Sequence, residues 1–373
     1  MLEKNKKMLF FCGYKSLYGG NFVPSLMALE DKLKIYGVNC VYVFPKEAQD
    51  RKWIEFLKAE RKRVLFFDFN LKNLEFCYEL SRIVKENQID YIYSHFAPIL
   101  KVELFSKLNK DICVFIHIHS DFSAGKPSIN SKIKNFLMYK LFSGDVFFFG
   151  VSKDFVQYNN KKIYYVPNGL AKRRVVSDHV GGKTIREQNE VLESETLCEI
   201  FAWSPIVKGL DIAVNAIKTL NEEDNVAIKL SIICGREMTI PKMKEWVSNN
   251  TKCSGEENYL LYFEPREDVF SYHEAADILL ATSRSEGFPY AVMEMLSLGK
   301  KCVVSDVPGL NWTKEYETVF PFQTESIDGC IKAIRNAINS ERQLDMNVAE
   351  SIQKNYSIDI WTDSITKQMN RII

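Results

Sequence analysis

The sequence alternates short runs of consecutive apolar residues with longer stretches in which apolar residues recur every three or four positions. The short runs are apolar throughout, which is typical of strands that helices cover on both faces. In the first half the predicted strands are Met8–Cys12, Val38–Phe44, Val64–Phe69, Tyr91–Ser94, Cys113–Ile118, Val146–Val151 and Ile163–Val166. The predicted helices between them include Phe22–Tyr36, Leu71–Asn87 and Ile129–Phe142. Strands that alternate with helices predict a parallel sheet in an α/β domain.

The alternation lapses between Leu170 and Thr196, where the chain is polar, and then starts again. The later predicted strands are Cys198–Trp203, Ala227–Cys234, Tyr259–Phe263, Ile278–Ala281 and Lys301–Ser305. The later predicted helices are Gly209–Leu220, Pro241–Asn249, Val269–Ala275 and Pro289–Leu298, followed by a mostly helical tail. We therefore expect an α/β protein with two doubly wound, Rossmann-like domains at 1–175 and 197–356, joined by a linker at 176–196. Two such domains are expected to bind a ligand between them, at the C-terminal ends of their strands.

The composition of the chain is that of a globular protein. Its 373 residues, 46% hydrophobic and 26% charged, are enough for two cores. No apolar run approaches the length of a membrane span, and the N-terminus lacks the pattern of a signal peptide. Nine cysteines stand singly, most of them in apolar runs. This pattern favours reduced core thiols over disulfides or a metal site, and it predicts a cytoplasmic protein.

Charge is distributed unevenly, although the net charge is only +1. Residues 1–175 hold 29 lysines and arginines against 17 acidic residues, whereas the remaining residues hold 20 against 31. The basic half could contact an anionic membrane face or a phosphate-bearing substrate, or its lysines could simply solvate the surface. Nucleic-acid binding is not expected, because the aromatic residues of this half fall in strand cores rather than between basic residues.

Two glutamates mark the predicted helix that starts near Pro289, in the stretch SRSEGFPYAVMEMLSLGKKCVVSD. Glu286 precedes the helix and Glu294 lies about two turns inside it, roughly 12 Å away at the helical rise. A helix N-terminus offers free N–H groups and a positive dipole end to an anion. The two carboxylates could therefore accept hydrogen bonds from the sugar and the ribose of a nucleotide-sugar whose diphosphate lies between them. The alternative is one structural glutamate at a helix start and another on a partly exposed face.

This stretch closely resembles the E-x7-E signature of the retaining GT-B glycosyltransferases of the large group 1 family. The matching residues are Glu286–Gly287–Phe288–Pro289, Glu294, Leu298–Gly299 and Val303–Val304–Ser305. Further matches, in the family's order, are the glycine loop Tyr18–Gly19–Gly20, the segments Val151–Ser152 and Val166–Pro167–Asn168–Gly169, and the donor-phosphate element Lys208–Gly209. The resemblance runs over nearly the whole chain. It implies the GT-B fold, in which two Rossmann-like domains face each other across a cleft and a C-terminal helix, here 357–373, packs back on the first domain.

The resemblance also implies a role for each matching residue. Glu286 would hold hydroxyls of the donor sugar, and Glu294 would bind the ribose. Lys208 would stabilise the charge of the departing diphosphate, and His119 would orient the sugar from the first domain. The other residues implied in donor binding are Gly19, Gly20, Ser204, Arg236, Gly287, Phe288, Pro289 and Tyr290. Taken alone, a glycine pair is often an ordinary turn, and a strand-end histidine is often structural. The lysine is different, because its charge is disfavoured at a helix start unless an anion accompanies it.

Two positions depart from the family's pattern. Trp203 stands where the family commonly has an arginine that joins the lysine on the diphosphate, so one charge-assisted contact is missing. Either Arg236, Arg266 or Arg284 compensates, or donor binding is weaker or altered. In the glycine loop, Asn21 stands where an acidic residue is frequent.

The implied activity is transfer of a sugar from a nucleotide-diphosphate-sugar to a glycan or lipid-linked glycan with retention of configuration, as in bacterial surface polysaccharide synthesis. The resemblance implies no metal and no cofactor, and we prefer a UDP-sugar over a GDP-sugar as the donor. A donor phosphate oxygen would take the acceptor proton. The basic, apolar stretch Ser131–Phe142 could hold the protein peripherally at the inner face of an anionic membrane, or it could be a packed helix with snorkelling lysines.

Two other functions stay open. A nucleotide-sugar epimerase of the same fold would form product from the donor alone, without an acceptor. A catalytically silent, nucleotide-sugar-binding partner in a polysaccharide assembly complex would bind the nucleotide without turnover, and Trp203 is the residue that keeps this alternative open.

Overall fold

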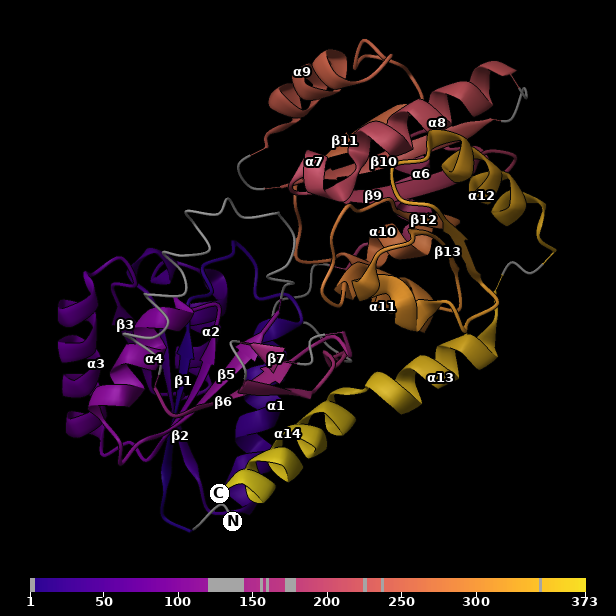
Figure 1. Ribbon diagram of the computed structural model, residues 1–373. Helices are drawn as coiled ribbons and strands as arrows, with labels where there is room; N and C mark the ends of the chain where they lie inside the picture. Colours follow the sequence, from indigo (N-terminus) through magenta and orange to yellow (C-terminus); the bar gives the residue numbers. More distant parts are fainter. Residues whose placement is uncertain are drawn as a thin grey trace, which may run out of the picture. The chain divides into compact units, whose positions relative to one another are not determined.

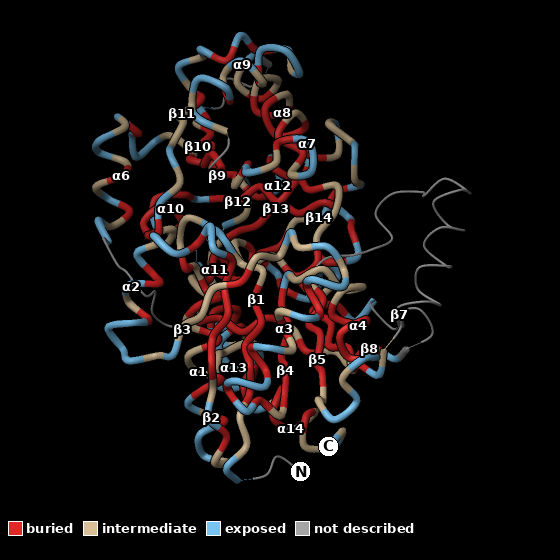
Figure 2. The backbone as a smooth tube through the Cα atoms, turned by 90° about the vertical axis from the view of Figure 1, so that its left-hand side faces the viewer, coloured by how far each residue is buried: buried red, intermediate tan, exposed pale blue. Residues whose placement is uncertain are grey.

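The computed structural model describes residues 4–119, 144–154, 157–158, 161–171, 179–223, 227–235, 238–341 and 344–373. The chain divides into two compact units, each with its own sheet (Figure 1). The first unit contains Met1–Val176 and Ile358–Ile373, and the second contains Ser177–Ser357. In both units the central strands are buried along their length (Figure 2), as expected for strands that are apolar on both faces.

The N-terminal unit holds a sheet in the order β3-β2-β1-β4-β5-β6-β8-β7, parallel except for the two-residue β7. Its strands are β1 (Lys7–Cys12), β2 (Asn39–Pro45), β3 (Val64–Phe67), β4 (Tyr91–His95), β5 (Cys113–Ile118), β6 (Val146–Gly150), β7 (Gln157–Tyr158) and β8 (Lys161–Tyr165). Its described helices are α1 (Phe22–Ile35), the 3-10 helix η1 (Lys46–Ala48), α2 (Lys52–Ala59), α3 (Asn73–Asn87), α4 (Ile99–Leu108) and α14 (Ile358–Ile372). The parallel order confirms the predicted doubly wound sheet.

Helices cover both faces of this sheet, because successive side chains of a strand point to opposite faces. Phe10 of β1 packs in the core on one face with residues of α1 and α14, whereas Leu9 packs on the other face with residues of α3 and α4. The helix α14 lies beside α1 (Figure 1). Gly169 permits this contact, because a Cβ atom at this position would lie 2.5 Å from the Cβ of Trp361 on α14.

The C-terminal unit holds a six-stranded parallel sheet in the order β11-β10-β9-β12-β13-β14. Its strands are β9 (Thr196–Ala202), β10 (Ile228–Cys234), β11 (Leu260–Phe263), β12 (Ile278–Ala281), β13 (Lys301–Ser305) and β14 (Val319–Phe322). Its described helices are α6 (Gly182–Gln188), α7 (Pro205–Lys208), α8 (Leu210–Glu223), α9 (Ile240–Asn250), α10 (Phe270–Ala275), α11 (Tyr290–Ser297), the 3-10 helix η2 (Pro308–Thr313), α12 (Ile327–Asn339) and α13 (Met346–Tyr356).

Six strands of the N-terminal sheet follow the same order as the six strands of the C-terminal sheet. Numbered within each unit, the order is 3-2-1-4-5-6, that of dinucleotide-binding folds. The order reverses between the first and fourth strands, β1 and β4 in one unit and β9 and β12 in the other. Ligands of open parallel sheets bind outside the carboxyl ends of the strands at this switch point.

The linker predicted over 176–196 is wrong in part. The short helix α6 lies inside this range, and its Ile185 is buried with Val191, Tyr272 and Ala275 of the C-terminal unit. The hydroxyl of Ser271 accepts hydrogen bonds from the backbone N–H groups of residues 180 and 181. A seven-residue helix in a polar stretch carries too few apolar residues to show a helical period.

The cysteines lie mostly in the cores of the two units. All nine are free, seven of them buried and two half-buried. Within the described part of the chain, no helix combines the length and the apolar character that crossing a membrane requires. The predicted helix Ile129–Phe142, with the basic stretch Ser131–Phe142, lies outside the described residues.

Candidate active site

The carboxyl ends of β9 and β12 carry the two charged residues on which the predicted site depends. These strands are neighbours in the sheet, with Ile278 beside Cys198. Lys208 closes α7, the short helix that follows β9, and Glu286 lies in the loop between β12 and α11. The sequence separates them widely, whereas the sheet brings them together at its switch point.

Lys208 and Glu286 form an ion pair. The Lys208 Nζ donates a hydrogen bond to the Glu286 Oε1 at 2.5 Å, and the Ser283 hydroxyl donates to the same oxygen at 2.6 Å. The two charged side chains are only 15% and 10% exposed, so water screens them weakly. A small cavity of about 30 Å³ borders both residues. A wider one of about 500 Å³ lies in the N-terminal unit, beside β3 and α3, and contains none of the predicted site residues.

The backbone that carries Lys208 is fastened directly to the loop that carries Glu286. The Thr282 hydroxyl donates to the carbonyl oxygens of Lys208 and Gly209, both at 2.9 Å. Gly209 has a φ of +64°, and a Cβ atom there would lie 2.0 Å from the Thr282 carbonyl oxygen. Only glycine meets both conditions, which explains physically why a glycine follows this lysine.

The end of β13 fixes the other side of the same loop. The Ser305 hydroxyl, fully buried, donates to the carbonyl oxygen of Ser283 at 2.5 Å. In η2, a Cβ atom at Gly309 would lie 2.1 Å from the Glu286 carbonyl oxygen. The backbone of Glu286 is therefore held from two directions, and its carboxylate is placed before any ligand arrives.

Arg284 anchors this loop rather than supplying the missing positive charge. Its guanidinium binds the carboxylates of Asp211 and Glu325 and donates to the Ile206 carbonyl oxygen at 2.6 Å. Hydrogen bonds to these two carboxylates raise the pKa of Arg284. Of the other two candidates, Arg266 is exposed in the loop after β11, and Arg236 lies outside the described residues.

Trp203 interacts with the lysine through its ring. The Lys208 Nζ lies 5.4 Å from the ring centroid of Trp203, whose side chain is 62% exposed. Such a cation–π contact is worth about 0.5–1 kcal/mol at an exposed site. The turn after β10 packs closely here, because a Cβ atom at Gly235 would lie 2.6 Å from the Trp203 Cα. The tryptophan therefore orients Lys208 but cannot donate the hydrogen bonds of an arginine.

Glu294 is buried, which contradicts the alternative of a partly exposed helix face. Its side chain is 4% exposed, and its Oε2 lies 3.2 Å from the Nε2 of His273 on α10. Glu294 lies on α11 beside His273, whereas Glu286 lies in the preceding loop beside Lys208.

The remaining predicted residues of this unit lie around the start of α11 and α7. Phe288 is 4% exposed and stacks on Trp312, with ring centroids 4.4 Å apart, so a ligand would meet its backbone only. Pro289 caps α11 rather than opening it, and Tyr290 is half-buried. Gly287 is buried. Ser204 precedes α7, and its carbonyl oxygen accepts the Lys208 N–H at 2.9 Å.

In the N-terminal unit, the glycine loop leads from β1 into α1. The Gly19 carbonyl oxygen accepts the Val23 N–H, and Gly20 has a φ of +54°. Asn21 is buried, and its Oδ1 accepts the Ala171 N–H at 3.1 Å. The amide therefore ties the loop to the segment after VPNG, which gives a structural reason for asparagine at this position.

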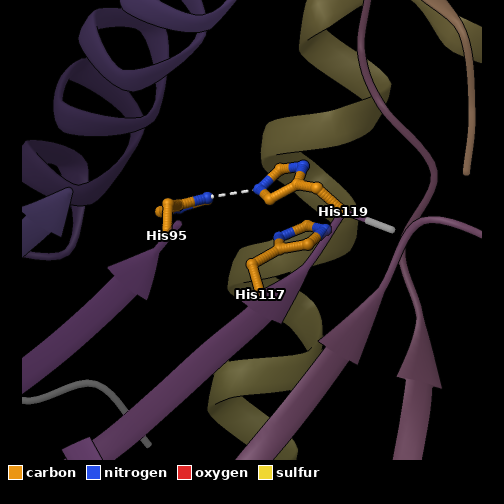
Figure 3. Close-up of side chains that lie close together, drawn as sticks. All are labelled: His95, His117 and His119. Carbon is orange, nitrogen blue, oxygen red and sulfur yellow. Dashed lines mark hydrogen bonds between the residues drawn. The ribbon is translucent and has the colours of Figure 1, made fainter. Parts of the chain in front are cut away.

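His119 belongs to a stack of three histidines at the carboxyl ends of β4 and β5 (Figure 3). His95 lies beside His117 in the strand register, and His119 follows two residues later on the same face. One ring nitrogen of His95 shares a hydrogen bond with His119 at 2.9 Å. The His119 ring also stacks on Phe96, with centroids 4.2 Å apart. Its predicted neighbours Ser120 and Asp121 lie outside the described residues.

The three histidines offer nitrogen atoms within 4.8 Å of one another, the one such group found in the described residues. A ring nitrogen directs its lone pair in the plane of the ring, so a metal ion must lie near the plane of every imidazole that binds it. The rings of His117 and His119 are nearly parallel, at 14°, with centroids 4.7 Å apart. The rings of His95 and His117 are likewise stacked, at 25°, so the three histidines form a stack of rings.

Burial sets the protonation of this stack. It lowers the pKa of His117 to about 3 and the pKa of His95 and His119 well below the ordinary value. The folded protein therefore keeps these rings neutral where the unfolded chain binds protons. Its stability should fall as the pH drops through the ordinary histidine range, below about 6.5.

We expect urea unfolding to show this loss between about pH 7 and about pH 5, at roughly 2 kcal/mol for each histidine that stays neutral. The buried His273, whose pKa is raised, contributes with the opposite sign. The variant His117→Gln isolates one member of the stack, because it should reduce the pH dependence by one histidine's share. An identical pH dependence in the variant and the original protein would contradict the assignment.

Several residues that build the site were not found from the sequence. They are Ser283, Thr282, Gly309, His273 and Glu199, and Arg284 was considered only as a replacement for the missing cation and not as an anchor of the loop. One of them left a detectable signal. Glu199 is a charged residue inside the apolar run LCEIFA, and a charge in a doubly covered strand must have a buried partner. The others are a histidine on α10, a serine and a threonine of the loop after β12, and a glycine of η2, and only the structure shows their contacts.

Comparisons with known proteins agree on one fold. The family model "Glycosyl transferases group 1" matches residues 200–340. No protein in the curated comparison matches the sequence. A glycosyltransferase from Rickettsia africae is similar in structure, with a TM-score of 0.74 and 15% identity over 99% of this chain and 98% of that chain.

Two further solved structures are similar. HepE from Anabaena in complex with UDP-glucose has a TM-score of 0.73 and 15% identity over 98% of this chain and 99% of that chain. WaaG, a glycosyltransferase involved in lipopolysaccharide biosynthesis, has a TM-score of 0.60 and 14% identity over 97% of this chain and 98% of that chain. Together with the two parallel sheets, these likenesses confirm the predicted GT-B fold.

Proposed function

Residues 200–340 form a domain of the group 1 glycosyltransferases on a GT-B fold, and from this premise we propose that the protein transfers a sugar from a UDP-sugar with retention of configuration. The acceptor we propose is a glycan or lipid-linked glycan of a bacterial surface polysaccharide. The preference for uridine rests on solved relatives: similar structures of HepE contain UDP and UDP-glucose.

The observation that carries the proposal is the ion pair between Lys208 and Glu286 at the switch point of the sheet. A cation and a carboxylate held 2.5 Å apart and little exposed offer one group to a phosphate and another to hydroxyls. The backbone contacts through Gly209, Thr282 and Ser305 place both groups in advance. A site stabilises charge that develops in the transition state when its charged groups are preorganised in this way.

In the proposed reaction, the bond between the sugar and the diphosphate breaks through a transition state that resembles an oxocarbenium ion. The Lys208 ammonium and the backbone N–H groups at the start of α11 receive the growing charge of the leaving diphosphate. The Glu286 carboxylate accepts hydrogen bonds from donor-sugar hydroxyls and forms no covalent bond. Glu294 accepts hydrogen bonds from the ribose. The contact of His119 with the sugar stays a prediction, as does proton transfer from the acceptor to a donor phosphate oxygen.

Calorimetry and product analysis test the proposal. We expect UDP to bind more tightly than GDP, and UDP to be released from a UDP-sugar only when a glycan acceptor is present. A changed sugar without an acceptor would indicate the epimerase, and binding without turnover on any acceptor would indicate the silent partner. Absence of binding by both nucleotides would overturn the proposal.

The membrane contact is tested separately. We propose that the basic N-terminal half brings the protein to anionic lipid, since the lipid-linked acceptor would be found there. The protein should then sediment with vesicles that contain phosphatidylglycerol and not with neutral phosphatidylcholine vesicles, and added salt should release it. Equal sedimentation with both would refute the electrostatic contact and favour a soluble acceptor.

A further inference from the structure

Three charged side chains from three elements meet in the core of the C-terminal unit. His273 on α10 lies between Glu199 of β9 and Glu294 of α11. Its Nδ1 is hydrogen-bonded to the Glu199 Oε1, and its Nε2 lies 3.2 Å from the Glu294 Oε2. The side chains of Glu199 and His273 are fully buried, and that of Glu294 is 4% exposed. Both ring nitrogens therefore face a carboxylate, so the protonated ring can donate to both at once.

The two carboxylates keep the ring charged. Burial by itself lowers the pKa of His273, but the attraction of Glu199 and the hydrogen bonds to both carboxylates outweigh it and raise this pKa to about 9. At neutral pH the group is an imidazolium between two anions. A buried carboxylate without such a partner costs several kcal/mol and takes up a proton instead. His273 therefore stabilises the ionised form of Glu294.

The surroundings leave the imidazolium few other partners among the described residues. The rings of Phe201 and Phe270 lie beside it, with centroids 5.3 Å and 6.0 Å away. The charge of Glu199 also raises the pKa of the Lys300 ammonium and of the thiols of Cys198 and Cys302, although burial is the larger influence on all three. The described structure gives Glu199 one hydrogen-bonded oxygen, and its Oε2 is buried without a hydrogen-bond partner. The hydrogen bond of the Glu199 carboxylate therefore goes to His273.

We infer that Glu199 and His273 form a buried charge relay that fixes the ionised carboxylate of Glu294 for the ribose hydroxyls of the donor. This inference rests on the proposed function, in which Glu294 binds the ribose. His273 is a positioning residue, since it acts through Glu294 and is too deeply buried to contact the nucleotide. The gain is preorganisation: a carboxylate held in one rotamer and one charge state loses little freedom when the ligand binds.

The test compares UDP with 2′,3′-dideoxy-UDP, which lacks the hydroxyls that Glu294 would bind. Hydrogen bonds to a carboxylate should give the original protein a preference for UDP of roughly 10- to 100-fold. His273→Gln should reduce this preference to about 3-fold or less while the dideoxy analogue binds as before. Glu274→Gln is the matched control, because Glu274 follows His273 on α10 but contacts the N–H of Gly182 instead. It should keep the full preference.

Charge dependence separates a relay from simple packing. In Glu199→Gln, the side chain at position 199 can still accept a hydrogen bond from His273. The variant lacks the negative charge of Glu199 that raises the pKa of His273. This variant should show the preference at about pH 6 and lose it by about pH 8, where an unassisted imidazole is neutral. The original protein should lose its preference for UDP only as the pH rises through about 9. Because uracil titrates in the same way in both ligands, the ratio of their affinities cancels its contribution.

The outcomes are distinguishable. If the original protein binds neither ligand, the proposed function fails. If it binds both equally, the ribose role of Glu294 fails and the inference with it. If it prefers UDP and His273→Gln shows the same preference, the inference alone is overturned. Should His273→Gln fail to fold, the pH dependence of the original protein and of Glu199→Gln still decides, since a preference that is constant with pH in both excludes the relay.

Discussion

Replacing Glu286 by glutamine should lower sugar transfer by roughly 100-fold or more without weakening the binding of UDP. In the donor-free protein the Glu286 carboxylate occupies Lys208, so an incoming diphosphate must compete with it. Removing the negative charge of Glu286 frees the Lys208 ammonium and removes the repulsion between this carboxylate and the diphosphate. The contacts of the carboxylate with the donor-sugar hydroxyls, which are needed in the transition state, are lost. Calorimetry with UDP and the rate of UDP release from the donor measure the two effects separately.

Two other variants help to interpret the result for Glu286→Gln. Lys208→Met should lose both UDP affinity and transfer, because it removes the cation itself. Glu325→Gln is the matched control: this carboxylate also pairs with a cation of the same unit, Arg284, but it does not contact Lys208. Its transfer rate should stay within a few-fold of the original. Weaker UDP binding by Glu286→Gln would mean that the carboxylate helps to hold the nucleotide, and unchanged transfer would remove Glu286 from the mechanism.

Replacing Gly209 by alanine should destabilise the C-terminal unit by about 3 kcal/mol or more. The positive φ accounts for part of this cost, and the clash between the new Cβ and the Thr282 carbonyl oxygen accounts for the rest. The clash pushes apart the two loops that carry Lys208 and Glu286. Urea unfolding should show the loss of stability, and UDP binding should weaken under conditions in which the variant is folded.

Gly181→Ala separates the two contributions. Gly181 has φ +83° and ψ 150°, a conformation that only glycine adopts readily, but a Cβ there would meet nothing within 4 Å. This variant should show the backbone cost of roughly 1–3 kcal/mol alone and should bind UDP normally. If both variants lose the same stability and Gly209→Ala still binds UDP, the close approach at Thr282 does not position the site.

The sequence was sufficient for the sheets because their strands are apolar on both faces. The predicted Cys113–Ile118, Ile278–Ala281 and Lys301–Ser305 have the same bounds in the structure. The edge strand β14 was missed, since its sequence, VFPF, is short and contains proline. Helices α2 and α4 were missed as well, although each of them buries several apolar residues. Boundaries set by dense packing can thus be predicted, whereas short elements at an edge depend on neighbours that the local sequence does not specify.

The candidate site shows the same division. The resemblance implied that Lys208 and Glu286 both bind the donor, whereas their direct pairing follows from the order of the strands in the structure. The burial of Phe288 and the attachment of Arg284 to Asp211 and Glu325 depend on side-chain directions and loop geometry. The three-membered cluster around His273 joins residues that are far apart in the chain, so neither spacing nor period reveals it.

The position of α14 has a consequence for biosynthesis. Its Trp361, Ile365 and Met369 pack with residues of β1 and α1 in one core of the N-terminal unit. In the chain, however, they follow the whole of the C-terminal unit. A ribosome therefore releases the second unit's sequence before the first unit can bury its last apolar face. During translation the N-terminal unit therefore keeps core residues exposed until α14 is synthesised, and the C-terminal unit can fold before it.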